Sequence, residues 1–340
     1  MILKKEKLSS LLDMLASQAS VYVPSTVPAD EKEGSAGAQT CFAPYQTGSS
    51  VDFGSANTNL SPKEVLFPQT ETLYSYSKLG EDITLEETVN STNQILFGVR
   101  SCDSYSIDRM DEVFLTRTFV DTLYCERRTN TLIVAMGCTA PHRSCFCTSF
   151  GIDPSRAEGA DIQLTDTGNS YFVEALTDKG TEALQTWGTY LEEGGEPTAA
   201  TLEFSLTLDT SKVKESLEKM FDSPYWNDLA MKCLNCGTCA FVCPTCHCFD
   251  MSQNNKGNEG YRFRTWDSCM YTDYTLMAGN HNPRPTKMQR LRNRFMHKLS
   301  FYNDRYGSSM CCGCGRCIEM CPVNIDITRI IEDSEEVAAQ

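Results

Sequence analysis

Two four-cysteine motifs constrain the fold of this chain more than any other feature. The first reads CLNCGTCAFVCP, from Cys233 to Pro244, and the second reads CCGCGRCIEMCP, from Cys311 to Pro322. Both contain the pattern C-x2-C-x2-C-x3-C-P. Such a chain brings four thiols close together in each of two short segments. This pattern favours the binding of a metal or an inorganic cluster over packing in an ordinary apolar core.

The spacing is the one with which bacterial two-cluster ferredoxins hold [4Fe–4S] clusters, where the fourth cysteine of each motif ligates the other cluster. Three thiolates on one tight turn reach three irons of a cube, and the x3 step directs the fourth thiolate away. We therefore predict two clusters with crossed ligation. One ligand set is Cys233, Cys236, Cys239 and Cys321, and the other is Cys311, Cys314, Cys317 and Cys243.

Zinc is the alternative metal, because paired C-x2-C segments also bind it. Two complete motifs that each end in x3-C-P favour iron–sulfur clusters. The chain has 18 cysteines in 340 residues. It shows no apolar run of the roughly 20 residues that span a bilayer and no apolar signal core at its start. We therefore expect a cytoplasmic protein without a membrane span, in which clustered thiols bind metal and disulfides are rare.

Four further cysteines follow two apolar segments. Cys102 comes after NQILFGVR, and Cys138, Cys145 and Cys147 come after NTLIVAMG. If the two segments are neighbouring strands, their loops meet at one sheet edge, where four thiolates can hold a third [4Fe–4S] cluster. The spacing alone leaves four ordinary buried cysteines as the alternative.

The remaining cysteines have less defined expectations. Cys246, Cys248 and Cys269 are open between thiols packed behind a cluster, ligands of a further cluster and core residues. We expect no ligand role for Cys41, Cys125 and Cys312.

The charge is unevenly distributed. The chain carries a net charge of −15, which argues against a nucleic-acid surface. The segment from Arg284 to Arg316 nevertheless holds eight Lys and Arg residues against Asp304 alone. A solvated helix face is the ordinary reading of such a run. Because two clusters bracket this segment and nearby cations raise the reduction potential of a cluster, we favour cluster screening or partner docking for it. For its histidines, His281 and His297, we expect a packing or solvated role rather than metal ligation.

The pattern of apolar residues predicts an α+β protein with two domains. Residues 93–100 and 130–137 are predicted as buried strands, 106–119 as a helix between them, and 159–176 as a hairpin followed by a helix over 178–191. The segment 192–204 has the composition of a linker. We expect an α/β domain over residues 1–200 and a mostly helical, ferredoxin-like two-cluster domain over 201–340. No dinucleotide or phosphate-loop fingerprint is present.

The motifs together resemble a known family. CLNCGTCAFVCPTCHCFD, RTWDSCM, RLRNRFMHK and CCGCGRCIEMCPVNIDI resemble the two-cluster iron–sulfur subunit that anaerobic sulfite reductase shares with sulfhydrogenase-type NiFe hydrogenases, in which it is called β. The resemblance extends to the N-terminal half, through the segments 68–76, 99–115, 138–151 and 159–180. It implies that Cys102, Cys138, Cys145 and Cys147 are the family's ligands of a third cluster. The polar segment 30–60 matches nothing in it.

The resemblance also implies partners. The family's subunit carries electrons between a flavin subunit that handles NAD(P)H and a terminal sirohaem or NiFe subunit, so this chain is expected to have no catalytic residues of its own. Only 22% of its residues are charged, which is unlike a hyperthermophile protein. Because many sulfhydrogenases of the family it resembles are thermophilic, we expect sulfite reduction ahead of the sulfhydrogenase alternative. A stand-alone ferredoxin-like carrier and a cluster-based redox sensor are the other hypotheses, but neither explains the N-terminal domain.

Overall fold

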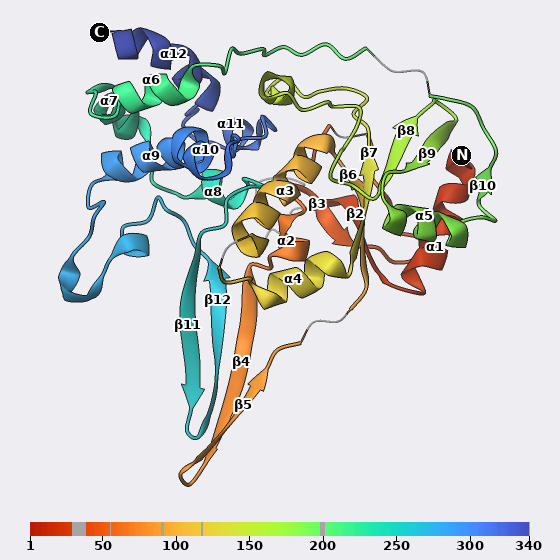
Figure 1. Cartoon of the computed structure of the whole chain (residues 1–340), viewed down its shortest axis with the longest axis horizontal. Helices are drawn as coiled ribbons and strands as arrows, with labels where there is room; N and C mark the ends of the chain where they lie inside the picture. Colours follow the sequence, from red (N-terminus) through yellow and green to blue (C-terminus); the bar gives the residue numbers. More distant parts are fainter. Residues whose placement is uncertain (29–38, 55, 90–91, 117, 198–200, 340) are drawn as a thin grey trace.

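The computed structural model describes residues 1–28, 39–54, 56–89, 92–116, 118–197 and 201–339. Three regions are visible in Figure 1: a large sheet with its helices, a group of C-terminal helices, and a long β-arm that projects away from both. The chain starts at the large sheet, and its C-terminal helix lies at the opposite end of the molecule. The motif regions lie between these ends.

The large sheet has eight strands within the described residues, in the order β10-β1-β9-β8-β7-β6-β2-β3. Its centre is parallel, because β2, β6, β7 and β8 pair in the same direction, while its margins are antiparallel. The strands are β1 (Ile2–Lys4), β2 (Ser20–Val27), β3 (Gln39–Pro44), β6 (Gln94–Val99), β7 (Thr131–Met136), β8 (Ile162–Asp166), β9 (Ser170–Ala175) and β10 (Leu191–Glu192).

Helices bury both faces of this sheet, which is why β6 and β7 are buried along their whole length and apolar after their first residues, Gln94 and Thr131. One core contains Phe97, Val134 and Trp187 with the apolar side of α1, and the other contains Leu96, Ile133 and Phe114 of α3. The helices of this half are α1 (Leu8–Ala16), α2 (Lys63–Leu66), α3 (Ser101–Leu115), α4 (Thr122–Thr129) and α5 (Asp178–Thr186), with short 3₁₀ turns at Lys5–Lys7 and Cys147–Phe150.

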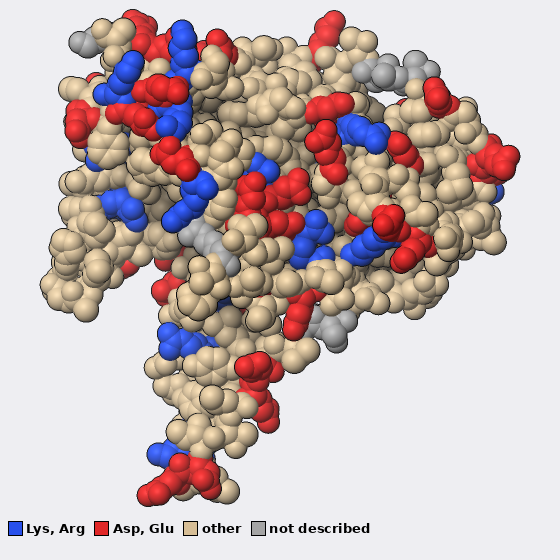
Figure 2. Space-filling view, in the orientation of Figure 1, with Lys and Arg blue, Asp and Glu red and all other residues tan. Residues whose placement is uncertain are grey.

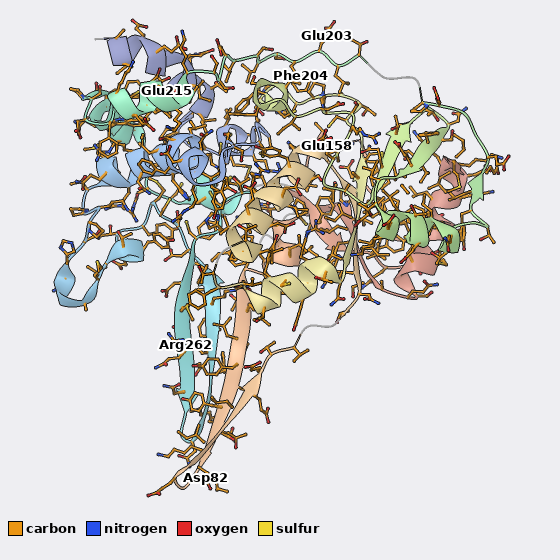
Figure 3. The ribbon with its side chains drawn as sticks, in the orientation of Figure 1. Asp82, Glu158, Glu203, Phe204, Glu215 and Arg262 are labelled. Atoms are coloured by element: carbon orange, nitrogen blue, oxygen red, sulfur yellow. The ribbon has the colours of Figure 1, made fainter. Side chains whose placement is uncertain are left out.

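The β-arm is a four-stranded antiparallel sheet in the order β11-β12-β4-β5. It joins β4 (Thr70–Leu79) and β5 (Asp82–Glu87) to β11 (Phe249–Lys256) and β12 (Glu259–Trp266). At its base Arg264, which is 3% exposed, donates to Glu71 over 2.7 Å and pairs with Asp121. Figure 3 labels Asp82 at the tip of the arm and Arg262 along it.

The C-terminal helices pack around Trp226, Phe295 and Leu217. α9 ends in a π-helix at His297–Phe301, a rare form that recurs at functional sites. The helices of this half are α6 (Val213–Lys219), α7 (Tyr225–Lys232), α8 (Thr238–Phe241), α9 (Lys287–Met296), α10 (Tyr302–Tyr306), α11 (Arg316–Glu319) and α12 (Ile327–Ala339), with 3₁₀ turns at Asp273–Thr275 and Ala278–Asn280.

Most of the expected elements are present. The two buried strands form β6 and β7, which are neighbours and parallel; the hairpin forms β8 and β9, and the helices form α3 and α5. The helix α3 begins at Ser101, five residues earlier than expected, and α5 ends at Thr186. The expectation of a mostly helical second half omitted the β11–β12 hairpin, which pairs with β4 of the first half.

Two further observations concern a membrane span and the polar segment 30–60. Within the described residues, no helix combines the length and the apolar composition needed to cross a membrane. Part of the polar segment 30–60 lies outside the described residues, and the rest forms β3 and a loop that reaches the second cysteine motif.

Candidate iron–sulfur centres

The first cavity gathers the first ligand set. Cys233, Cys236, Cys239 and Cys321 all line it, in an empty volume of ≈ 490 Å³. The fourth thiol comes from the second motif, as crossed ligation requires. Backbone N–H groups donate to two of the sulfurs, from Asn235 to Cys233 over 3.3 Å and from Ile325 to Cys321 over 3.2 Å.

The second cavity gathers the other set. Cys243, Cys311, Cys314 and Cys317 line an empty volume of ≈ 300 Å³. Cys243 now comes from the first motif. Both cavities therefore draw three thiols from one motif and one from the other, as the spacing predicts.

The third cavity gathers the N-terminal cysteines. Cys102, Cys138, Cys145 and Cys147 line an empty volume of ≈ 320 Å³. Cys102 lies in the first turn of α3, directly after β6, and Cys138 follows β7. Because β6 and β7 are adjacent and parallel, their carboxyl ends meet at one edge, and this brings the four thiols together.

The second motif runs past all three cavities. Cys317 also lines the first cavity, and Cys314 also lines the third. The close approach depends on glycine. Gly313 has φ of 61°, and a Cβ there would meet the backbone of Cys147 at 2.6 Å. The backbone amide of Phe146 donates to the carbonyl of Gly313 over 2.8 Å. The segment 311–317 therefore connects the three sites.

Buried cations surround the first two cavities. Arg290, Arg294 and Lys298 are 5%, 3% and 3% exposed, so the basic segment is not a solvated face. In Figure 2 acidic and basic side chains are mixed on the surface in view. Arg294 donates to the carbonyl of Cys239 over 3.0 Å, and Lys63 donates to the carbonyls of Ala240, Cys243 and Cys246.

Arg294 provides a test of whether these sites suit a cluster. Its guanidinium lines the first cavity, and its Nε is buried without a hydrogen-bond partner among the described residues. Leaving a buried charged donor unpaired is costly. The sulfides and thiolates of a cluster are acceptors of the right charge, so the donor set fits a [4Fe–4S] group.

The thiols themselves fit the same reading. Burial raises the pKa of Cys317 to about 12 and that of Cys311 to about 11. Such thiols become thiolates when a metal displaces the proton. Within the described part of the chain, no three His, Cys, Asp or Glu side chains lie close enough to hold a single metal ion. A cube instead takes its four thiolates at separate corners.

The third cavity has a charged support that the sequence analysis missed. Arg316, 2% exposed, donates to both carboxylate oxygens of Asp103, over 2.6 and 2.8 Å, and Asp103 is fully buried beside Cys102. Asn57 donates to the carbonyl of Cys314 over 2.9 Å. Lys63 was also missed. Their partners stand far away in the chain, so no local pattern identifies them; only the position of Arg316 inside the motif gave a signal.

Cys246, Cys248 and Cys269 line none of the three cavities. Cys246 hydrogen-bonds Cys243, and Cys248 hydrogen-bonds Cys269 and Tyr274. Cys312, for which no ligand role was expected, lines the second cavity. His297 packs against His247, and burial lowers the pKa of His297 to about 3. This agrees with a packing role for His297.

Comparison with known proteins also indicates a protein with two iron–sulfur clusters. A family model described as a 4Fe-4S dicluster domain matches residues 232–325. The chain is 32% identical over 297 residues to sulfhydrogenase 2 subunit beta of Pyrococcus furiosus, covering 84% of this chain and 86% of the relative. No solved structure matches the chain. The dicluster match means that the chain binds two [4Fe–4S] clusters and transfers electrons, and by its similarity over most of both lengths it belongs to the sulfhydrogenase β-subunit family.

Proposed function

We propose that this chain passes electrons between a flavin subunit that handles NAD(P)H and a terminal catalytic subunit. The observation that carries the proposal is the crossing of the two cysteine motifs in two adjacent cavities within the matched dicluster region. When bound, the clusters supply one-electron transfer. The chain's own part is to hold their thiolates, bury them and surround them with fixed cations.

The proposed ligands follow the cavities. One cluster takes Cys233, Cys236, Cys239 and Cys321, and the other takes Cys243, Cys311, Cys314 and Cys317. Residues 201–340 form the proposed dicluster domain, and the β11–β12 hairpin ties it to the α/β domain of residues 1–200. All 18 cysteines lie in the described part of the chain and none forms a disulfide, which fits the proposed cytoplasmic location.

The third cavity supports a third [4Fe–4S] cluster on Cys102, Cys138, Cys145 and Cys147. Its four thiols converge, and Cys314 lies between it and the second cavity, so an electron could cross to the α/β domain. Phe204, labelled in Figure 3 on the segment that links the two halves, also lines this cavity.

Iron and sulfide analysis tests the third cluster. The anaerobically reconstituted chain should hold about twelve iron atoms for three cubes, and Cys145→Ala should lower the number to about eight. Cys125→Ala is the control, since Cys125 lines none of the three cavities, and it should keep all of the iron. A wild-type content of about eight would show that the third cluster does not exist.

The terminal partner is the finer question. The similarity to a sulfhydrogenase subunit favours a NiFe hydrogenase partner, so we propose this one ahead of the sirohaem sulfite reductase expected from the composition. The composition, with 22% charged residues, remains the one observation that favours sulfite reduction.

Anaerobic purification of the tagged chain from its native host separates these functions. A co-purifying subunit with nickel and hydrogen uptake supports the sulfhydrogenase assignment. A partner with sirohaem absorbance and sulfite-dependent NAD(P)H oxidation would replace it. A monomer without partners that exchanges electrons with several carriers would make the chain a stand-alone ferredoxin.

A further inference from the structure

Lys298 contacts a proposed cluster ligand directly. Its Nζ lies 3.2 Å from Sγ of Cys243 and 2.7 Å from Oγ1 of Thr245. The side chain is 3% exposed, and within the described residues no carboxylate forms an ion pair with it. Lys298 therefore places a buried, uncompensated positive charge on the second cavity.

Among the described residues, no Lys or Arg side chain hydrogen-bonds a sulfur of the first ligand set in the first cavity. Its sulfurs accept backbone N–H groups of Asn235 and Ile325, which carry no net charge, and Cys236 is exposed to solvent. Lys287, on the same helix as Arg294, donates to the carbonyl of Cys233 rather than to a sulfur. Solvent weakens the effect of any nearby charge on this cavity.

The third cavity is different again. Two buried cations of the described chain lie near it. Arg316 is paired over two short hydrogen bonds with the carboxylate of Asp103, and Arg100 donates to the backbone carbonyls of Gly137 and Phe53 rather than to a sulfur. The pair of Arg316 and Asp103 adds no net charge beside Cys102.

Arg294 lines the first cavity and donates to the carbonyl of Cys239, but its charge also lies near Cys317 and Cys243 of the second set. Its charge is therefore shared by the two sites, whereas Lys298 contacts a ligand of the second alone.

Reduction adds one negative charge to a cluster, and a fixed cation nearby favours the reduced form most where solvent is excluded. The second cavity shares Cys317 with the first and Cys314 with the third, so we call its cluster the middle cluster. We propose that Lys298 gives the middle cluster the highest reduction potential of the chain, so that it is the first to be reduced. This inference rests on the proposed function and identifies Lys298 as a positioning residue that acts through Cys243.

A redox titration of the anaerobic full-length holoprotein, followed by electron paramagnetic resonance, tests the proposal. Cys243→Ser marks the signal of the middle cluster, because an oxygen ligand changes its spectrum. In wild type this signal should appear at the highest potential. In Lys298→Met, the ratio of reduced to oxidised middle cluster at a fixed potential should fall at least tenfold, which corresponds to about 59 mV for one electron.

Three variants complete the experiment. Lys287→Met removes a lysine that contacts the backbone of Cys233 in the first set and no sulfur, so it should leave the potential of the middle cluster nearly unchanged. Lys298→Arg should restore most of the wild-type value because it keeps the charge. Thr245→Val removes the hydroxyl that contacts both Lys298 and Cys243 and should shift the middle cluster about twofold in the same direction, even if Lys298→Met fails to assemble.

The outcomes are distinct. If the clusters are present and the middle signal is not the first to be reduced, the role of Lys298 is refuted and the proposed function stands. The same holds if neither Lys298→Met nor Thr245→Val moves it. If the holoprotein lacks two clusters, the proposed function itself fails.

Discussion

At the scale of single residues, the ligand sets depend on which thiols share a cavity rather than on which share a motif. Cys321 stands 88 residues after Cys233, yet both line the first cavity, while Cys243 lines the second. The x3 step places each fourth cysteine beyond the short helix α8 or α11 that follows its turn. A substitution of the fourth cysteine of one motif should therefore damage the cluster that is held by the first three cysteines of the other motif.

Cys321→Ala tests this crossing. It should remove or convert the cluster held by Cys233, Cys236 and Cys239, and leave the cluster of the second cavity intact. Mössbauer or paramagnetic resonance spectra of the variant and of Cys243→Ala should show complementary losses. Damage confined to the cluster of each cysteine's own motif would disprove crossed ligation.

Asp108 gives a prediction about pH. Burial, and then the neighbouring Asp111 carboxylate, raise the pKa of Asp108 to about 6, whereas an unfolded Asp has a pKa of about 3.9. The folded state thus favours the protonated form. This contribution to stability is fully present below pH of about 4 and is lost as the pH rises through about 6.

Asp108→Asn should accordingly raise the free energy of unfolding at pH 7.5 by about 2 kcal/mol and change it little at pH 4. Anaerobic urea titrations at the two pH values measure this difference. Asp82→Asn, at the tip of the arm, is the control and should change neither value. A lower stability of Asp108→Asn at pH 7.5 would contradict the argument.

Spacing was sufficient to predict which of the eight motif cysteines share a cavity, because iron geometry limits how four thiols can be arranged. It could not identify Lys63 or the pair of Asp103 with Arg316. Those contacts join residues that are more than 170 positions apart, and nothing in the local sequence of a buried Lys or Asp distinguishes it from a surface residue.

At the scale of elements, the β-arm is the part whose fold least resembles the expectation. β6 and β7 were identifiable because both faces are buried and every residue after Gln94 and Thr131 is apolar. β11 is polar and largely exposed and shows no clear alternation, whereas β12 alternates Tyr261 and Phe263 with Arg262 and Arg264, a period-two signal that the expectation of a helical second half overlooked. Their partner β4 lies nearly 200 residues earlier, and the tertiary pairing defines the hairpin.

Arg264 attaches this arm to the rest of the protein. It is buried between Glu71 of β4 and Asp121 at the start of α4. Arg264→Met would leave the buried Glu71 carboxylate with less compensation, and we expect a loss of about 3 kcal/mol in the free energy of unfolding. Anaerobic urea unfolding measures it.

Arg262→Met provides the matched comparison, because this residue lies on the same strand without a buried carboxylate partner among the described residues. Its effect should stay within about 0.5 kcal/mol. Equal losses in the two variants would mean that the network at the arm's base does not stabilise the junction.

At the scale of the whole molecule, the chain order and the spatial order differ. Residues 311–317, near the end of the sequence, line parts of all three cavities, and residues of the first half line the second and the third. The protein therefore offers a path for electrons but no dinucleotide fingerprint in its sequence.

The isolated holoprotein should accept electrons from dithionite and lose its visible absorbance on reduction. It should show no turnover with NADH and sulfite, or with NADPH and hydrogen, because each reaction needs a centre outside this chain. The assay is stopped-flow reduction followed by steady-state measurements. Turnover by the single chain would refute the assignment as an electron-transfer subunit.

The crossed arrangement of the motifs also has a consequence for the physics of the chain. With the proposed ligands, each cluster acts as a cross-link between distant segments, and the cluster that would hold both Cys233 and Cys321 closes a loop of nearly the whole C-terminal half. Closing a loop of about 100 residues removes on the order of 4.7 kcal/mol of entropy from the unfolded chain. Because both clusters join the same two segments, oxygen damage to either one would leave the other to hold the ends together, and the region would lose its order only when the second cross-link opens.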